Sequence, residues 1–354
     1  MLHKDRIINL KKSLKERILV LDGAMGTMIQ QHNLSESDFR NSKFQNWSID
    51  LRGNGDVLNL TNSKIIRSVH SAFLDSGADI ILTNTFNSNK ISQSDYGLED
   101  YSNEMNYSAA KLAREVADKF SDKDPGKMRF VAGAIGPTNK TASISPKVED
   151  PAYRNISFDE LKDVYRESAL SLIDGGVDFL ILETIFDTLN AKAGIFAIGE
   201  INQKRKCKIP LMISGTITDF SGRNLSGQTV EAFWNSVRHA QPLSIGLNCS
   251  FGAELLTPAI EELSRVADTN ILAYPNAGLP NPMGHYDETP GKTASYLANW
   301  AKSGIINIVG GCCGTTPDHI KKIYEEVSKY SPRLIPKIKK TIKLSGLEPF
   351  GIIS

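Results

Sequence analysis

Eight short hydrophobic runs, each followed by a longer stretch of helical periodicity, extend from one end of the chain to the other. The runs lie at residues 18–22, 79–84, 129–135, 178–183, 210–215, 243–248, 271–275 and 305–310. Each run is almost continuously apolar, which is typical of strands that are buried on both faces of a parallel sheet. This order of elements therefore predicts an α/β protein with eight parallel strands.

The stretches between the runs carry apolar residues at helical spacing. In residues 62–77, one face contains Ile65, Ile66, Val69 and Phe73. Comparable stretches lie at 101–120, 157–175, 187–203, 228–241, 252–267, 290–303 and 317–330. Eight strand–helix units predict a single-domain (β/α)8 TIM barrel over residues 1–330, and an open doubly wound sheet is the alternative.

The two ends of the chain lie outside this repeat. Ile7, Leu10 and Leu14 recur at helical spacing near the amino terminus. We expect an amphipathic helix that covers one end of the barrel, rather than a targeting peptide. Residues 331–354 begin with a basic segment that contains two prolines and no acidic residue before position 344. They are expected to form an extended basic linker or tail.

Charge and composition exclude several classes of protein. The 354 residues include 41 Lys and Arg against 40 Asp and Glu, and the formal net charge of +1 favours neither nucleic acid nor an anionic membrane as a partner. No apolar run approaches the roughly 18 residues of a membrane span. Four cysteines are too few for a disulfide scaffold. We therefore expect free thiols and a cytoplasmic protein.

Three of the four cysteines follow the ends of predicted strands. Cys249 comes directly after the sixth strand, and Cys312 and Cys313 come after the eighth. Because the carboxyl ends of barrel strands meet at one face, these thiols should converge, whereas Cys207 precedes the fifth strand at the opposite end. Three converging thiolates suit Zn²⁺. The alternatives for the adjacent pair are buried apolar thiols or a vicinal disulfide.

A site with three cysteines leaves a fourth tetrahedral position. His319 is the nearby candidate, but it lies in the first turn of the last helix and is expected to face outward. An open position can accept a substrate thiol, whose pKa Zn²⁺ would lower toward neutrality or below it. The predicted reaction is therefore S-alkylation of a thiol.

Two carboxylates also follow strand ends on the same face. Asp22 ends the first strand and Glu183 ends the fourth. We expect these side chains to bind a substrate ammonium group, with the backbone amides of Gly23 and Ala24 accepting a carboxylate. The alternative is that both acids are structural and are satisfied by backbone groups at the barrel corners.

Two asparagines occupy similar positions. Asn84 follows the second strand, and Asn248 precedes Cys249. The sequence leaves open whether these side chains contact the substrate or support the residues that do.

Several motifs together resemble a known family. They are LDGAMGT, GADIILTNTF, GAIGPTNKTASISP, FLILETIFDT, GLNCSFG and GGCCGTTP. Over roughly residues 15–330 the chain resembles the homocysteine S-methyltransferase family, and in particular the homocysteine-binding barrel of cobalamin-dependent methionine synthases. The stretch GPTNKTASISPKVEDPAYRNISFDEL and the terminal LSGLEPF resemble this cobalamin-dependent branch more specifically.

The resemblance implies that Cys249, Cys312 and Cys313 ligate Zn²⁺ and that homocysteine binds to it as a thiolate. It also implies that Asp22 and Glu183 hold the polar end of the amino acid. The methyl group would come from methylcobalamin, which a separate domain or subunit carries and which is regenerated from 5-methyltetrahydrofolate. The partners would be cobalamin-binding and folate-binding modules, in cis or in trans, with 331–354 resembling the connection to the folate-binding domain.

Two alternatives remain open at this point. One is an enzyme that uses betaine or S-methylmethionine directly as the methyl donor. The other is a non-catalytic, zinc-stabilised scaffold subunit.

Overall fold

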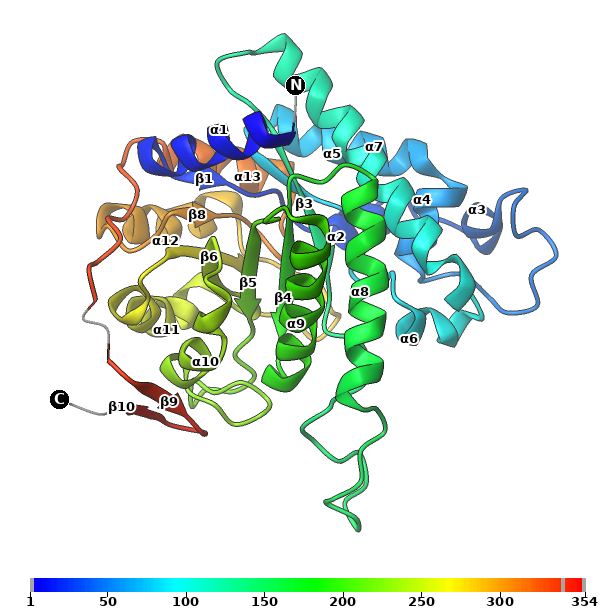
Figure 1. Ribbon diagram of the computed structural model, residues 1–354. Helices are drawn as coiled ribbons and strands as arrows, with labels where there is room; N and C mark the ends of the chain where they lie inside the picture. The colour runs from blue at the N-terminus through cyan, green and yellow to red at the C-terminus, as the bar shows by residue number, and fades with distance from the viewer. Residues whose placement is uncertain (1–2, 339–340, 352–354) are drawn as a thin grey trace.

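A closed barrel of parallel strands forms the centre of the protein (Figure 1). The computed structural model describes residues 3–338 and 341–351. The barrel strands are β1 (Leu19–Val20), β2 (Ile80–Leu82), β3 (Phe130–Ile135), β4 (Phe179–Ile185), β5 (Leu211–Gly215), β6 (Ser244–Gly252), β7 (Asn270–Asn276) and β8 (Ile308–Val309). Each strand from β2 to β7 pairs in parallel with the next, and β8 pairs with β1. A bridge between Leu21 and Ile80 joins β1 to β2. The predicted (β/α)8 barrel is confirmed, and the open sheet is wrong.

A layer of helices surrounds the strands and follows the predicted periodic stretches. These helices are α5 (Ser63–Asp75), α7 (Ser102–Lys123), α8 (Phe158–Asp174), α9 (Thr188–Arg205), α10 (Val230–Val237), α11 (Ala253–Val266), α12 (Pro290–Lys302) and α13 (Pro317–Val327). Local chemistry explains where they begin. At the start of α8, the Ser157 side chain accepts a hydrogen bond from the Glu160 amide, and the Glu160 carboxylate accepts one from the Ser157 amide. This reciprocal pair is a capping box.

Shorter helices occupy the segments after β1 and β2. They are α2 (Met25–Gln30), α3 (Glu36–Arg40), α4 (Leu58–Thr61) and α6 (Lys90–Gln93), with the 3₁₀ turns η1 (Gly55–Val57), η2 (Ser94–Tyr96) and η3 (Glu99–Tyr101). These segments lie at the carboxyl ends of the strands, where barrels of this class build their sites. None of the helices among the described residues is both long enough and apolar enough to cross a bilayer.

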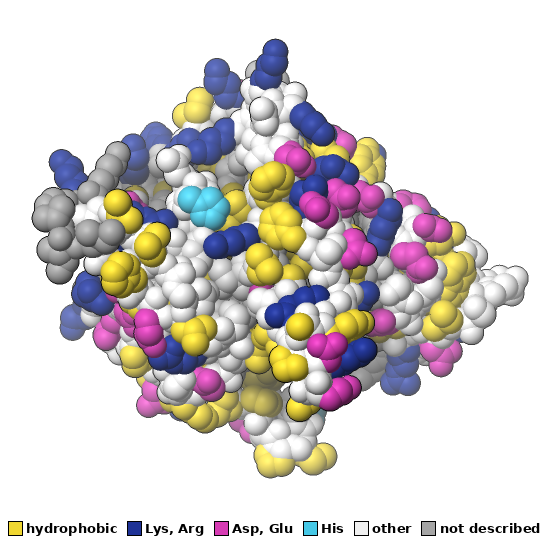
Figure 2. All heavy atoms as spheres, turned by 60° about the horizontal axis from the view of Figure 1, so that its bottom comes forward, with side chains coloured by type: hydrophobic (Ala, Val, Ile, Leu, Met, Phe, Trp, Pro, Cys, Tyr) yellow, Lys and Arg dark blue, Asp and Glu magenta, His cyan; other side chains and the backbone are white. Residues whose placement is uncertain are grey.

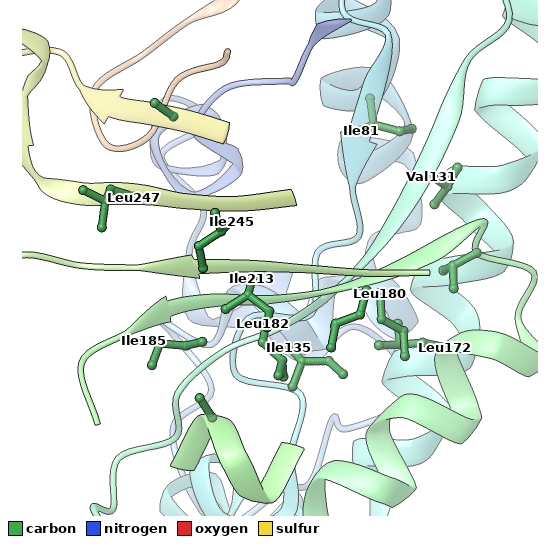
Figure 3. Close-up of a cluster of buried hydrophobic side chains, with 14 of the residues drawn as sticks. Ile81, Val131, Ile135, Leu172, Leu180, Leu182, Ile185, Ile213, Ile245 and Leu247 are labelled. Carbon is green, nitrogen blue, oxygen red and sulfur yellow. The ribbon is translucent and has the colours of Figure 1, made fainter. Parts of the chain in front are cut away.

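Alternate residues of each strand face the barrel interior and the helix layer. On β4, Phe179 and Ile181 are buried inside the barrel, whereas Leu180 and Leu182 face outward. Figure 3 shows the outward-facing side chains, with Leu172 of α8 beside Leu180. Burial on both faces accounts for the continuous apolar runs in the sequence.

Helix α1 (His3–Glu16) covers the amino end of the barrel, as expected (Figure 1). Its Leu10 and Leu14 are buried in the same cluster as the interior strand residues. Arg6 forms an ion pair with Asp178, whose other carboxylate oxygen lies 2.6 Å from Nη1 of Arg114. The helix is therefore held both by apolar contacts and by a buried carboxylate.

A second buried aspartate, Asp79, lies at the start of β2. Its carboxylate accepts hydrogen bonds from the Arg17 guanidinium at 2.7 Å and from the Val20 amide at 2.9 Å. Asp79 and Asp178 each follow a glycine turn in the sequence, and Gly77 and Gly176 both have φ of +101°. These turns need a residue with a left-handed backbone conformation, which glycine adopts without strain.

The segment after α13 is attached to the barrel by one buried side chain. Arg333 is buried and makes four hydrogen bonds, to Oγ and O of Ser264 and to the carbonyls of Ala267 and Thr269. Further on, β9 (Lys343–Ser345) and β10 (Pro349–Gly351) form an antiparallel hairpin that lies against α10. A buried guanidinium is satisfied here by carbonyls at helix and strand ends.

Candidate functional site

The thiols of Cys249, Cys312 and Cys313 lie together at the carboxyl end of the barrel. Their Sγ atoms are all within 4.8 Å of one another, and those of Cys249 and Cys313 are 3.8 Å apart. Cys249 lies on β6, and the other two lie in the loop between β8 and α13. Cys207 is exposed at the other end of the barrel. The four thiols are free, so neither a vicinal nor any other disulfide forms among them.

Unusual backbone conformations direct the thiols toward one another. Cys249 and Ser250 both adopt left-handed conformations, with φ of 61° and 59°. The Ser250 hydroxyl is 2.8 Å from Oγ1 of Thr216, which stabilises this turn. In the loop after β8, a Cβ on Gly311 would lie 2.3 Å from Oγ1 of Thr315. Glycine is therefore required there for the chain to pass that side chain.

Asn248 supports the site rather than facing the cavity. It is fully buried, and its Oδ1 accepts from the Ser214 hydroxyl at 2.6 Å and from the Thr184 amide at 3.1 Å. Its Nδ2 donates to Oγ1 of Thr184 at 2.8 Å. These three bonds give the side chain a supporting role, and Asn248 is not among the residues that line the neighbouring cavity.

The three thiols share their protons unequally. Hydrogen bonds from Cys249 and Cys312 lower the pKa of Cys313, and a further hydrogen bond from Tyr286 acts in the same direction. The hydrogen bond to Cys249 and burial raise the pKa of Cys312. The cluster thus favours a thiolate at Cys313. A set of three close sulfur donors has the composition that soft metal ions such as Zn²⁺ prefer.

His319 does not face outward as the sequence suggested, nor does it join the cluster. It is buried, its Nδ1 accepts from the Thr316 amide at 3.2 Å, and its Nε2 lies 2.9 Å from the carbonyl oxygen of Glu288. Position 319 is the third residue of α13, so its side chain turns back to the start of the helix, where it meets the Glu288 carbonyl. Both ring nitrogens are engaged in structural hydrogen bonds.

A cavity of about 570 Å³ opens beside the thiols. It is lined by the three cysteines and by Asp22 and Glu183, so the residues that the sequence placed at this face do converge. Cavities of this volume accommodate ligands well beyond the size of an amino acid.

Asp22 and Glu183 are both buried within this cavity. Burial raises the pKa of Asp22 well above its usual range, and the charge of Glu183 adds to the shift. Oδ2 of Asp22 accepts from the Leu82 amide at 2.9 Å, but Oδ1 has no hydrogen-bond partner among the described residues. Burial raises the pKa of Glu183 to about 7, although the Tyr274 hydroxyl donates to it at 3.2 Å. A cationic ligand group would relieve the cost of ionising both carboxylates.

The remaining predicted residues lie on the cavity wall with different partners. The Ala24 amide donates to Oγ1 of Thr315 at 3.2 Å, so that amide is already paired. Gly23 packs closely, since a Cβ there would lie 2.7 Å from the Phe73 ring. Asn84 donates from Nδ2 to the Gly55 carbonyl at 2.8 Å, which ties η1 to the end of β2. Asn84 therefore has a supporting contact in addition to its place on the wall.

Sequence reasoning missed several polar residues of the cavity, and three of them are titratable. Asp56 is buried in η1, and burial raises its pKa to about 6. Arg52, in the same insertion, is the one basic side chain on the cavity wall among the described residues. Tyr274 lies on β7, where the period-two pattern of an interior-facing position could have indicated it. The other two follow from how residues 23–61 fold, which strand patterns do not reveal.

Comparison with known proteins places the chain in a family and a fold. Residues 19–327 match the family described as homocysteine S-methyltransferase. Among solved structures, the metallated form of the homocysteine methyltransferase MmuM from Escherichia coli is 23% identical, with a TM-score of 0.68 over 88% of this chain and 96% of that one. The apo form of the same protein is 22% identical, with a TM-score of 0.64 over 88% and 97%. At this level of identity, the likeness shows a shared fold.

Proposed function

Since the chain belongs to the homocysteine S-methyltransferase family, we propose that it binds homocysteine beside Cys249, Cys312 and Cys313 and forms methionine by methylation of the substrate sulfur. One observation carries this proposal: the three thiols and the unpartnered carboxylate oxygen of Asp22 line the same cavity. A sulfur-binding group and an ammonium-binding group are what recognition of an amino thiol requires.

We propose that the three cysteines hold Zn²⁺. The donor set fits this ion, because it offers three sulfurs within 4.8 Å of one another and His319 is engaged elsewhere. Bound Zn²⁺ lowers the pKa of a coordinated thiol, so that its sulfur is nucleophilic at neutral pH. A catalytic zinc site needs only three protein ligands, which leaves a position for the substrate.

The side chains of the cavity would orient the substrate. Asp22 and Glu183 would bind its ammonium group, and the raised pKa of each carboxyl would fall as the cation approaches. The Gly23 amide is available for the carboxylate, whereas the Ala24 amide would have to exchange its bond to Thr315. Holding the thiol in line with the methyl donor is the main contribution of the protein to a displacement reaction.

We propose methylcobalamin, carried by a separate domain or subunit, as the methyl donor. The homocysteine sulfur would form a bond to the methyl carbon, and the electron pair of the broken bond would remain with the donor. A large donor has to approach from the carboxyl end, because α1 closes the other end (Figure 1). Loops at this end carry exposed apolar residues, of which Phe220 and Met283 are both 81% exposed. Figure 2 shows hydrophobic side chains gathered among charged ones on this face.

The cavity volume keeps a second candidate open. At about 570 Å³, it has room for homocysteine together with a small donor such as S-methylmethionine or betaine. We further propose that residues 1–330 form the catalytic barrel and that 331–354 connect it to the folate-binding module.

The donor is tested by incubating the zinc-loaded protein with homocysteine and each donor separately and measuring methionine. We expect turnover with methylcobalamin. Turnover with betaine or S-methylmethionine and none with methylcobalamin would overturn the assignment of the donor.

Two cysteine variants test whether the site is catalytic. Cys312→Ala should lose zinc and methyl transfer while keeping its circular dichroism spectrum, and Cys207→Ala should match the unmodified protein. Unfolding of Cys312→Ala would instead support a zinc-stabilised scaffold.

A further inference from the structure

A second cavity, of about 510 Å³, lies at the amino end of the barrel, the end that α1 covers. Its walls come from α1, the last turns of α9, the 3₁₀ turn η4 (Arg238–Ala240) and the segments that precede β5, β6 and β7. It shares no lining residue with the cavity beside the cysteines and is nearly as large. The proposed methyl transfer makes no use of it.

The charges around this cavity are all of one sign. Lys11 of α1, Lys208 before β5 and His239 of η4 line it, and no aspartate or glutamate does. None of these three side chains has an ion-pair partner among the described residues, whereas the neighbouring Lys12 pairs with Glu16 at 3.9 Å. Two lysine side chains and an imidazole from three separate segments therefore face one space with no counter-charge. The cavity beside the cysteines has the opposite balance, with three acids and one arginine.

The floor of this amino-end cavity is apolar. Ile195, Ile198, Ile209 and Leu211 contribute to it, and all four are buried, with between 3% and 9% of their surface exposed. Such a surface contributes binding energy only when an apolar ligand group covers it.

On the wall of this cavity, one side-chain amide keeps a free donor while two backbone carbonyls are already paired. Oδ1 of Asn202 accepts from the Ile209 amide at 2.9 Å, so Nδ2 remains to donate. The carbonyls of Pro242 and Leu243 already accept from Oγ1 of Thr269, at 2.8 and 3.1 Å. A ligand that accepts hydrogen bonds would therefore match this wall better than one that donates them.

We propose that the amino-end cavity binds a small organic anion. Its carboxylate, sulfonate or phosphate group would lie between Lys11, Lys208 and His239, and its apolar body would cover the isoleucine and leucine floor. Such a ligand joins α1 to the segments before β5 and β6, so binding should raise the unfolding temperature of the full chain.

The fluorescent anion 8-anilinonaphthalene-1-sulfonate is a suitable probe, because it combines a sulfonate with an apolar body. We expect saturable binding to the folded protein, weakened about fivefold in each of Lys11→Gln and Lys208→Gln and weakened further by added salt. The matched controls Lys12→Gln and Lys204→Gln remove nearby charges that do not line the cavity, and they should leave the affinity unchanged. Melting curves would establish that each variant is folded.

Competition distinguishes the ligand classes and the two cavities. Benzoate should displace the probe at concentrations at which inorganic phosphate does not, because only benzoate covers the floor. The proposal is overturned by the absence of saturable binding, by equal losses in the control variants, by equal displacement by phosphate, or by displacement by homocysteine. None of these outcomes bears on methyl transfer, so this proposal and the proposed function fail separately.

Discussion

Asn248 binds Thr184 through both ends of its side-chain amide. Nδ2 donates to Oγ1 at 2.8 Å, and Oδ1 accepts from the backbone amide at 3.1 Å. Thr184 follows Glu183 on β4 and has a left-handed φ of 55°, while Asn248 precedes Cys249 on β6. One buried amide therefore holds the strand end that carries the carboxylate against the strand end that carries the thiol.

Replacement of Asn248 should weaken metal binding. Asn248→Ala leaves the Ser214 hydroxyl and the Thr184 amide without their partners, so we expect a loss of about 2–3 kcal/mol in unfolding free energy and about tenfold or more in zinc affinity. Denaturant titration and competition with a chromophoric chelator measure these effects. Asn235→Ala is the matched control, because Asn235 is buried and its amide atoms have no partner among the described residues. Equal zinc affinity in both variants would contradict the positioning role.

Removal of metal should leave the barrel folded. The three thiols lie at one end of the strands, and the apolar clusters on both faces of the sheet do not depend on them. Dialysis against a chelator should therefore abolish methyl transfer while the far-ultraviolet circular dichroism persists. Cooperative loss of secondary structure on chelation would show that the metal is structural.

Glu183→Gln should act on recognition of the substrate ammonium group. We expect kcat/KM for homocysteine to fall about tenfold, because a hydrogen bond to a charged group is lost. For 4-mercaptobutyrate, which lacks the amino group, the variant and the unmodified protein should be alike. A similar loss with both thiols would mean that Glu183 acts elsewhere.

The same carboxyl group makes binding depend on pH. Burial raises the pKa of Glu183 to about 7 in the folded protein, and only its ionised form pairs with ammonium. Affinity for homocysteine should therefore increase as pH rises through about 7, and this increase should be smaller in Glu183→Gln. Isothermal titration across this range provides the check.

His70 should make the protein sensitive to acid. It is fully buried in α5, neither ring nitrogen has a hydrogen-bond partner among the described residues, and burial lowers its pKa to about 3. In the unfolded chain this histidine binds a proton near pH 6.5, whereas in the folded chain it stays neutral down to about pH 3. The unfolding free energy should therefore fall by about 1.4 kcal/mol for each unit by which the pH is lowered between these values. Denaturant titrations should show a shallower decline for His70→Leu. The exposed His32→Leu should retain the original slope.

Arg333→Gln should destabilise the fold without altering the site. Removing a buried guanidinium that makes four hydrogen bonds should cost about 3 kcal/mol of unfolding free energy. Arg205→Gln, which removes an exposed pair with Asp174, should cost no more than about 0.5 kcal/mol. A loss of that small size for Arg333→Gln, measured by denaturant titration, would show that the segment after α13 contributes little to the barrel.

The barrel and the convergence of the thiols could be predicted because both depend on local patterns. A buried parallel strand is recognisable as an apolar run, and any residue that follows such a run lies at the carboxyl face. This argument located Cys249, Cys312 and Cys313, and also Asp22 and Glu183, without knowledge of a single contact.

Contacts between distant segments could not be predicted in this way. The bond from Asn248 to Thr184 joins residues 64 positions apart, and it depends on a left-handed turn at a residue that is not glycine. His319 bonds to the Glu288 carbonyl, 31 positions away, and Asp56 reaches the cavity because the 23–61 insertion returns to β2. None of these features leaves a periodic signal.

The buried ion pairs of Asp79 and Asp178 have a consequence for motion. Both carboxylates lie at the starts of strands, where they bind Arg17, Arg6 and Arg114, and so attach helices to the end of the barrel farthest from the thiols. Opening that end would expose both buried carboxylates together. The backbone amide protons beside them should therefore exchange with solvent only on global unfolding. Local opening is then expected in the loops at the other end, which is the end at which we propose that the substrate enters.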